Sequence, residues 1–381
     1  MKIAKIVVLL ALLSAAILFP IFSSDLALTS IAIFTLMFAA AATAWNIFAG
    51  YTGYIALGHA VFFGSGAYAL GIMCQRWHIG HQLLGTGKGD LSILLLHFSA
   101  DYAPFALVPL AGLIAALIAV PLGWVALRTR RHTFIVVTIA IFFVFQLLAF
   151  NLRGLTRGSA GLELPLPSWV YPFYNFPFYY AMLVILLLAL AVSWWVRHSK
   201  YGLGLLAIRD DEDRALGLGV KTGPSKLGAF VTSAFFVGML GAVWAYFLGS
   251  VFPQSAFDPL FDIAIALMGF LGGMGTLAGP IIGALLLEPT KQYFQFLPAL
   301  LFPNGGKGGD AGGFYLVAYG GLFLAIMLLL PEGVVPTLSK WWSQWRASRT
   351  NTESAPDDTD ASNQPAPVAM EQAGTGEEVN L

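Results

Sequence analysis

Residues 104–127 read PFALVPLAGLIAALIAVPLGWVAL, an apolar stretch without a single charged side chain. A helix needs roughly 17–25 predominantly apolar residues to cross a bilayer, so this stretch is long enough to span one. Lipid offers no hydrogen-bond partners, and only helices or closed barrels satisfy their own backbone groups there. Because the apolar stretches of this chain have helical length, they predict an all-α polytopic membrane bundle rather than a barrel of ~10-residue strands.

Eight further stretches share this length and apolar character. They are Ala4–Phe22, Leu26–Gly50, Tyr54–Met73, Phe134–Phe150, Tyr179–Val196, Leu227–Gly249, Phe261–Leu287 and Phe314–Leu330. The first follows Lys2 and Lys5, as the core of a signal peptide would, but no small-x-small cleavage site comes after it. We interpret it as an uncleaved span; a cleaved signal peptide is the alternative.

The composition agrees with a membrane location. Of 381 residues, 58% are hydrophobic and only 10% are charged, with a mean hydropathy of +0.76. Soluble domains carry about 25% charged residues, so most of this surface is expected to face lipid. Cys74 is the only cysteine, which excludes an internal disulfide or a redox pair.

Basic residues predict the orientation, because Lys and Arg concentrate in cytoplasmic loops. Nine full crossings would leave the basic group after the last span outside. The stretch Phe261–Leu287 is rich in glycine and contains Pro280. If it turns near Gly272–Gly275 and returns, about eight crossings remain and both termini are cytoplasmic in a prokaryotic inner membrane. The loop Glu288–Gly313 would then be periplasmic; a ninth full span is the alternative.

Two glycine-rich interruptions are the predicted substrate pathway, because broken segments in both halves of a transporter point to its binding site. Close packing of helices through small residues is the alternative. The single ionisable side chain well inside a span is a histidine, which either lines the pathway or is neutral and hydrogen-bonded to a backbone carbonyl. The candidate pathway residues are Gly53, Tyr54, Gly58, His59, Gly272, Gly273 and Gly275.

Several chemistries lack support in the sequence. There is no G-x-x-x-x-G-K-[ST] phosphate loop and no paired-histidine metal motif. Asp258, Asp262 and Glu288 are interpreted as lying only at the edges of spans, which argues against a proton-coupled carrier. We therefore expect a transporter component rather than an enzyme, with no catalytic residue, cofactor or metal of its own.

The segment Arg197–Lys226 is the most highly charged loop between spans. Asp210 or Asp211 can cap a short helix there, expected over Ile208–Leu218, and Gly217 or Gly219 can end it. Its apolar edge and charged face are typical of a contact with a separate ATPase; a solvated loop is the alternative. The expected contact residues are Ile208, Arg209, Asp210, Asp211, Glu212, Ala215, Leu216 and Gly217.

Two regions follow from this division. Residues 1–340 form the predicted permease domain, with residues 199–226 as its cytoplasmic coupling loop. Residues 350–381 are acidic and polar without an apolar period, which predicts a disordered cytoplasmic tail.

Four segments of the chain form a recognisable set. They are Gly50–Gly64 (GYTGYIALGHAVFFG), Ala207–Glu212 (AIRDDE) with Ala215–Gly217, Gly269–Ala284 (GFLGGMGTLAGPIIGA) and Pro331-Glu332-Gly333. Together these segments resemble LivM-type permeases of branched-chain amino acid ABC transporters. The resemblance implies an importer in which this chain pairs with a second, LivH-like permease. Two cytoplasmic ATPases would use the ATP, and an extracytoplasmic binding protein would deliver the substrate.

The same resemblance implies branched-chain amino acids as substrates, with urea or amides as the alternative. Membrane lipid is an expected partner and nucleic acid is not. The rival function is a carrier or facilitator that works alone. The neighbouring coding sequences distinguish the two, because an importer would be encoded beside a second permease, two ATPases with phosphate loops and a secreted binding protein.

Overall fold

The computed structural model describes residues 2–23, 25–77, 91–93, 96–98, 101–169, 173–301, 320–321, 324, 328, 333–337 and 341. The chain divides into two compact units, Met1–Thr337 and Leu338–Leu381. Everything below concerns the first unit. The predicted disordered tail, residues 350–381, lies outside the described residues, as does most of the apolar stretch 314–330.

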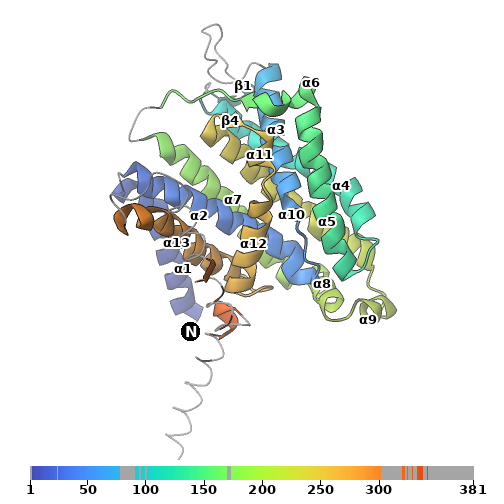
Figure 1. Ribbon diagram of the computed structural model, residues 1–381. Coiled ribbons are helices and arrows are strands. Elements are labelled where there is room, and N and C mark those ends of the chain that lie inside the picture. The colour runs from blue at the N-terminus through green and yellow to red at the C-terminus, as the bar shows by residue number, and fades with distance from the viewer. Residues whose placement is uncertain are drawn as a thin grey trace, which may run out of the picture. The chain divides into compact units, whose positions relative to one another are not determined.

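The first unit is built from helices. They are α1 (Lys2–Phe22), α2 (Leu26–Trp45), α3 (His59–Trp77), α4 (Ala103–Ala126), α5 (Arg131–Asn151), α6 (Arg153–Thr156), α7 (Phe176–His198), α8 (Lys200–Asp210), α9 (Glu212–Gly217), α10 (Thr222–Leu248), α11 (Pro253–Ala256), α12 (Pro259–Gly272) and α13 (Gly279–Leu301). Two short antiparallel pairs join β1 (Leu91–Ile93) to β2 (Leu96–Phe98) and β3 (Leu162–Glu163) to β4 (Ser250–Val251). The predicted all-α architecture is confirmed (Figure 1).

Within the described part of the chain, six helical segments are long and apolar enough to cross a membrane. They are Leu26–Gly50, Ala103–Ala126, Arg131–Asn151, Phe173–His198, Thr222–Leu248 and Pro253–Gly272. The first predicted span is also helical, as α1. The exact number of crossings stays a prediction.

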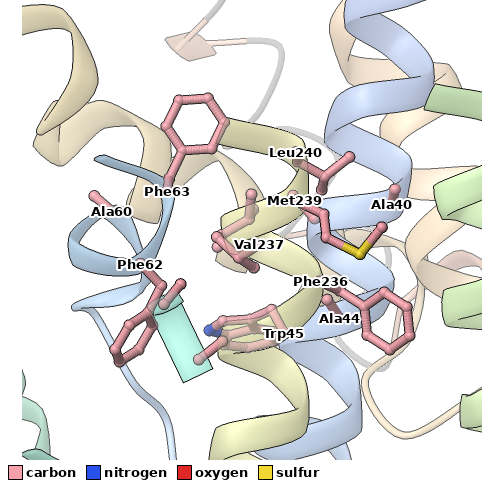
Figure 2. Packing of buried hydrophobic residues seen from close by; sticks show 14 of the residues in the cluster. Ala40, Ala44, Trp45, Ala60, Phe62, Phe63, Phe236, Val237, Met239 and Leu240 are labelled. Carbon is pink, nitrogen blue, oxygen red and sulfur yellow. The ribbon is translucent and has the colours of Figure 1, made fainter. Parts of the chain in front are cut away.

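The core forms where α10 packs against α2 and α3. Figure 2 shows Trp45 of α2 and Phe62 of α3 beside Val237 of α10, and all three are buried. Alanines such as Ala40 and Ala44 on α2 let the helices approach closely, as small residues do in membrane bundles. This packing leaves other large apolar side chains of α4 and α5 exposed, as a lipid-facing surface requires.

One end of the bundle collects the charged segments, and we call it the α8–α9 end. Figure 1 shows α8 and α9 lying together, beyond the end of α5. Asn175 at the start of α7 donates to Thr29 Oγ1 near the start of α2 over 2.8 Å. Both helices therefore begin at the opposite end and run toward the α8–α9 end.

The first glycine-rich interruption corrects one predicted span. Tyr54–Met73 is not a single helix, because α3 begins only at His59. The chain leaves α2 through a π-helical turn at Asn46–Gly50, and residues 53–58 are non-helical. Trp45 Nε1 donates to the carbonyl of Ala56 over 2.9 Å, so the non-helical segment 53–58 runs back beside α2.

The second interruption divides Phe261–Leu287 into two helices, with a turn at residues 273–278 that confirms the predicted position. A Cβ on Gly272 would lie 1.7 Å from the oxygen of Gly279, and one on Gly283 would lie 1.9 Å from that of Met268. Gly279 at the start of α13 thus faces the end of α12, and Gly283 further along α13 faces an earlier residue of α12. The two helices are therefore antiparallel and in backbone contact. The segment therefore returns, as the re-entrant interpretation expected.

The region after this turn corrects another expectation. Glu288–Gly313 was predicted to be a loop, but α13 continues to Leu301. Glu288 lies in the interior of that helix and is buried rather than at an edge. Asp262 is buried too. Its Oδ1 accepts the backbone N–H of Ala60 over 3.0 Å and so caps the start of α3.

Replacing Gly272 by alanine should destabilise the hairpin of α12 and α13. The added methyl would overlap the Gly279 backbone, and such overpacking costs about 1–3 kcal/mol. Thermal unfolding of the purified protein in detergent measures the loss. Gly154→Ala is the matched control, because a Cβ there meets nothing within 4 Å. Equal melting temperatures for the two variants would contradict the close approach.

Candidate functional site

The two glycine-rich interruptions meet at the side chain of Asn46. Its Oδ1 accepts the backbone N–H of Gly275 over 2.7 Å, and its Nδ2 donates to the carbonyl of Thr276 over 2.9 Å. Asn46 is fully buried, so these bonds replace partners that water would otherwise supply. Asn46 was not among the predicted pathway residues; the available signal was a polar amide at the end of the otherwise apolar run of α2.

Two arginines of the segment Arg197–Lys226 bind backbone carbonyls beside Asn46, where the two interruptions meet. Arg209 Nη1 donates to the carbonyl of Gly50 over 2.9 Å, and Arg197 Nη1 donates to the carbonyl of Gly275 over 2.6 Å. A Cβ on Gly275 would lie 2.1 Å from Arg209 Nη1 and 3.0 Å from the oxygen of Gly50. Glycine is required at position 275 because the arginine and the first interruption both occupy the space of a side chain.

A second contact joins the loop to the first interruption. Tyr54 donates its hydroxyl hydrogen to Glu212 Oε2, and Lys226 Nζ lies 2.5 Å from Glu212 Oε1 and 3.2 Å from the Tyr54 hydroxyl. Burial opposes ionisation of Glu212, but the hydrogen bonds from Lys226 and Tyr54 outweigh it and hold the pKa of the carboxyl below its usual value. Glu212 is therefore an anion fixed between two elements.

The start of α5 completes this arrangement. Arg131 Nη2 donates to the carbonyls of Ile208 and Arg209, over 2.8 and 2.7 Å, at the last turn of α8. Carbonyls at a helix C-terminus lack intrahelical partners and favour a cation. We call Asn46, Tyr54, Arg131, Arg197, Arg209, Glu212 and Lys226, with the backbone of Gly50, Gly275 and Thr276, the junction.

The predicted coupling residues lie on two helices, α8 and α9, rather than on one. Asp211 caps α9 by accepting the N–H groups of Asp213 and Arg214, as expected of Asp210 or Asp211, but Asp210 instead belongs to α8. The predicted single helix Ile208–Leu218 is therefore wrong: α8 and α9 are separate helices that meet at Asp211. Asp211 breaks the helix because its own side chain supplies the hydrogen bonds of the next one.

The apolar edge also differs from the prediction. Ala215 and Ile208 are buried, whereas Leu216 is 60% exposed and Leu218 is 84% exposed. Gly217 is exposed, and a Cβ there would meet nothing within 4 Å. The exposed surface of α9 is therefore made by Leu216 and Leu218 beside Asp213 and Arg214.

The predicted pathway residues lie at both interruptions. Gly53, Gly273 and Gly275 have positive φ and form turns, and Gly58 packs against Thr138 of α5. His59 is fully buried, with its Nε2 and Ser233 Oγ 2.8 Å apart, so a hydroxyl is one of its partners. Close packing thus explains Gly58 and Gly272, and a role of this set in a substrate pathway stays a prediction.

Comparison with known proteins identifies the family of the chain. Residues 27–331 match the family described as branched-chain amino acid transport system, permease component. The high-affinity branched-chain amino acid transport system permease proteins LivM of Escherichia coli K12 and of Salmonella typhimurium LT2 are both 26% identical over 357 residues. Each match covers 86% of this chain and 74% of the relative.

More distant relatives match a shorter part. The autoinducer 2 import system permease protein LsrC of Yersinia pseudotuberculosis is 31% identical over 117 residues, which is 29% of this chain and 33% of that protein. No solved structure gives a significant match. Because the family match spans most of the chain, this multi-pass membrane protein belongs to the permease components of branched-chain amino acid transport systems.

Proposed function

We propose that this chain forms one half of the membrane channel of an importer for branched-chain amino acids, driven by separate ATPases. The similarity to LivM over most of both chains supports the substrate class. A second, LivH-like permease would form the other half, two cytoplasmic ATPases would hydrolyse ATP, and an extracytoplasmic binding protein would deliver the amino acid. No cofactor binds this chain in the proposal.

The junction is the observation that carries the proposal. A movement can be transmitted only through contacts that differ between two states. Here α8 and α9 are joined by Arg209 and Glu212 to the first interruption, and Arg197 at the end of α7 reaches the second. A displacement of α9 by a docked ATPase would therefore be transmitted to both interruptions through hydrogen bonds and ion pairs.

The basic residues at the α8–α9 end indicate how the chain is oriented in the membrane. Basic residues concentrate in cytoplasmic loops, so the α8–α9 end is cytoplasmic in the proposal. A Cβ on Gly333 would lie 2.8 Å from the backbone of Gly273, at the turn that Arg197 holds. Residues 333–337 thus lie at the α8–α9 end, which supports a cytoplasmic C-terminus.

A carrier working alone is less well supported by these contacts. It would give no role to two leucines that are exposed beside charged residues at α9, whereas a docked ATPase would cover this apolar surface. Leu216 and Leu218 provide such a surface.

Replacing Arg209 by glutamine should uncouple ATP hydrolysis from uptake. The carbonyl of Gly50 would lose a charged partner, which costs about 1–3 kcal/mol and is expected to slow uptake about ten-fold. Uptake of labelled leucine and ATP hydrolysis are measured in vesicles that contain the complete importer. Arg128→Gln is the matched control, because Arg128 is an exposed arginine in the turn between α4 and α5, at the α8–α9 end. Normal coupling in the Arg209 variant would contradict transmission through the junction.

Replacing Leu216 and Leu218 together by aspartate should release the ATPases. Both side chains are exposed in this chain, so the change leaves the fold intact but places charges in the proposed contact. The amount of ATPase that copurifies with the permease in detergent measures the effect. Leu166→Asp, a change at an exposed leucine in the loop that follows β3, is the control and should retain the ATPase. Retention by the double variant would count against docking at α9.

A further inference from the structure

A groove of about 630 Å³ lies between α4 and α7, within the size range of ligand pockets. The rings of Phe105 on α4 and Phe178 on α7 are 5.3 Å apart, so both helices begin side by side. This is the end of the bundle opposite to the α8–α9 end. Among the described residues that line the groove none is charged, and nearly all are apolar. The groove therefore offers no partner to an ionic ligand.

The groove forms because α4 and α7 pack on different neighbours. Small residues bring α4 against α10: a Cβ on Gly238 would lie 2.4 Å from the Cβ of Ala115, and one on Gly112 would lie 2.5 Å from Cγ of Met239. The helix α7 packs mainly along α2 instead. Met239 and Val243 of α10 line the groove and are buried, so they make its floor.

The groove has the length of one leaflet of a bilayer. Its α7 side runs from Phe176 to Leu188 along one face of the helix, which is ~18 Å at 1.5 Å per residue. Half of a hydrocarbon layer ~30 Å thick is ~15 Å. Tyr102 and Tyr180 line the end of the groove where both helices begin. Tyrosine is enriched where hydrocarbon meets the headgroups, so the groove extends from that interface toward the middle of the membrane.

The groove is continuous with the lipid-facing surface of the bundle. On its α7 edge Val184 is 53% exposed and Leu188 is 47% exposed. On its α4 edge Pro109 is followed at four-residue spacing by Leu113 and Leu117, which are exposed on the same face of the helix. A lipid chain therefore reaches the groove from the bilayer without crossing a polar surface.

We propose that this groove binds one acyl chain of a phospholipid from the leaflet at the end opposite to α8 and α9. Lipid tails are as apolar as leucine, so burial from water contributes nothing here and dispersion contacts along the groove supply the binding energy. The chain lies over Met239 and Val243 and joins α4 to α7. This inference goes beyond the proposed function and depends only on the location of the protein in a membrane.

Photolabelling of the complete importer tests the site. The importer is reconstituted in vesicles that contain a phosphatidylcholine with a diazirine in the middle of one acyl chain, and the labelled peptides are identified by mass spectrometry. Peptides of α4 and α7 at the groove should carry more label than the exposed face of α5 around Val136 and Val144, where exchanging lipid is expected. Equal labelling of the two surfaces would overturn the proposal.

Replacing Ala181 by tryptophan should block the site, because Ala181 lines the groove and the indole would fill it. Labelling of the groove peptides should fall to the level found on α5. Ala191→Trp is the matched control, since it makes the same change on the same helix at an exposed residue outside the groove. It should label like the unaltered importer. Unchanged labelling of the groove in A181W would contradict a bound chain, and if A181W does not assemble, the unaltered importer still decides.

A cysteine at Val184 distinguishes a lipid chain from a helix of the second permease. Val184 is exposed at the edge of the groove, and the only natural cysteine, Cys74, is buried. Irradiation of V184C that carries benzophenone maleimide should attach phospholipid to this chain. Attachment to the second permease instead would assign the groove to an interface between permeases and overturn the proposal.

Discussion

Backbone groups that leave a helix inside a membrane need partners that lipid cannot supply, and this requirement organises the whole structure. The chain breaks its helices twice, at residues 53–58 and 273–278. Asn46 binds the N–H of Gly275 and the carbonyl of Thr276 in the second turn. Arg197 binds the carbonyl of Gly275, and Arg209 binds that of Gly50 just before the first interruption. Each unpaired group would otherwise cost several kcal/mol at that depth. The interruptions are therefore stable only while they are held together.

This mutual dependence links stability to transport. Arg209 of α8 and Glu212 of α9 bind the carbonyl of Gly50 and the hydroxyl of Tyr54, so these helices cannot move without changing partners at the first interruption. The second interruption is held by Asn46 of α2 and by Arg197 in the last turn of α7, the helix that α8 follows. The carboxylate of Glu212 and the cations around it form a network of short, largely buried contacts, which are stronger and more directional than exposed ion pairs. A rigid network of this kind suits the transfer of a movement from a partner to the proposed pathway.

The sequence was sufficient for the features that depend on local chemistry. Apolar length predicted the helices, and glycine density predicted both interruptions. The capping preference of aspartate predicted a cap at Asp210 or Asp211, and Asp211 is the residue that caps α9. The features that were missed depend on contacts between distant residues. Glu288 and Lys291 resembled a loop because charges are costly in lipid, yet both lie in α13, where Glu288 is buried and Lys291 packs over the ring of Phe38 on α2. Asn46, Arg197 and Asp262 acquire their roles only where separate helices meet.

The central claim is that α9 and the turn of the second interruption move as one body when the ATPases close. Spin labels at Leu218 and Val334 report this distance, and labels at Leu218 and Phe173 report the distance from α9 to the opposite end of α7. Pulsed electron–electron double resonance measures both distances in the complete importer, in the nucleotide-free and the ATP-trapped state. The account predicts an unchanged first distance and a changed second one. A first distance that changes while the second stays constant would contradict it.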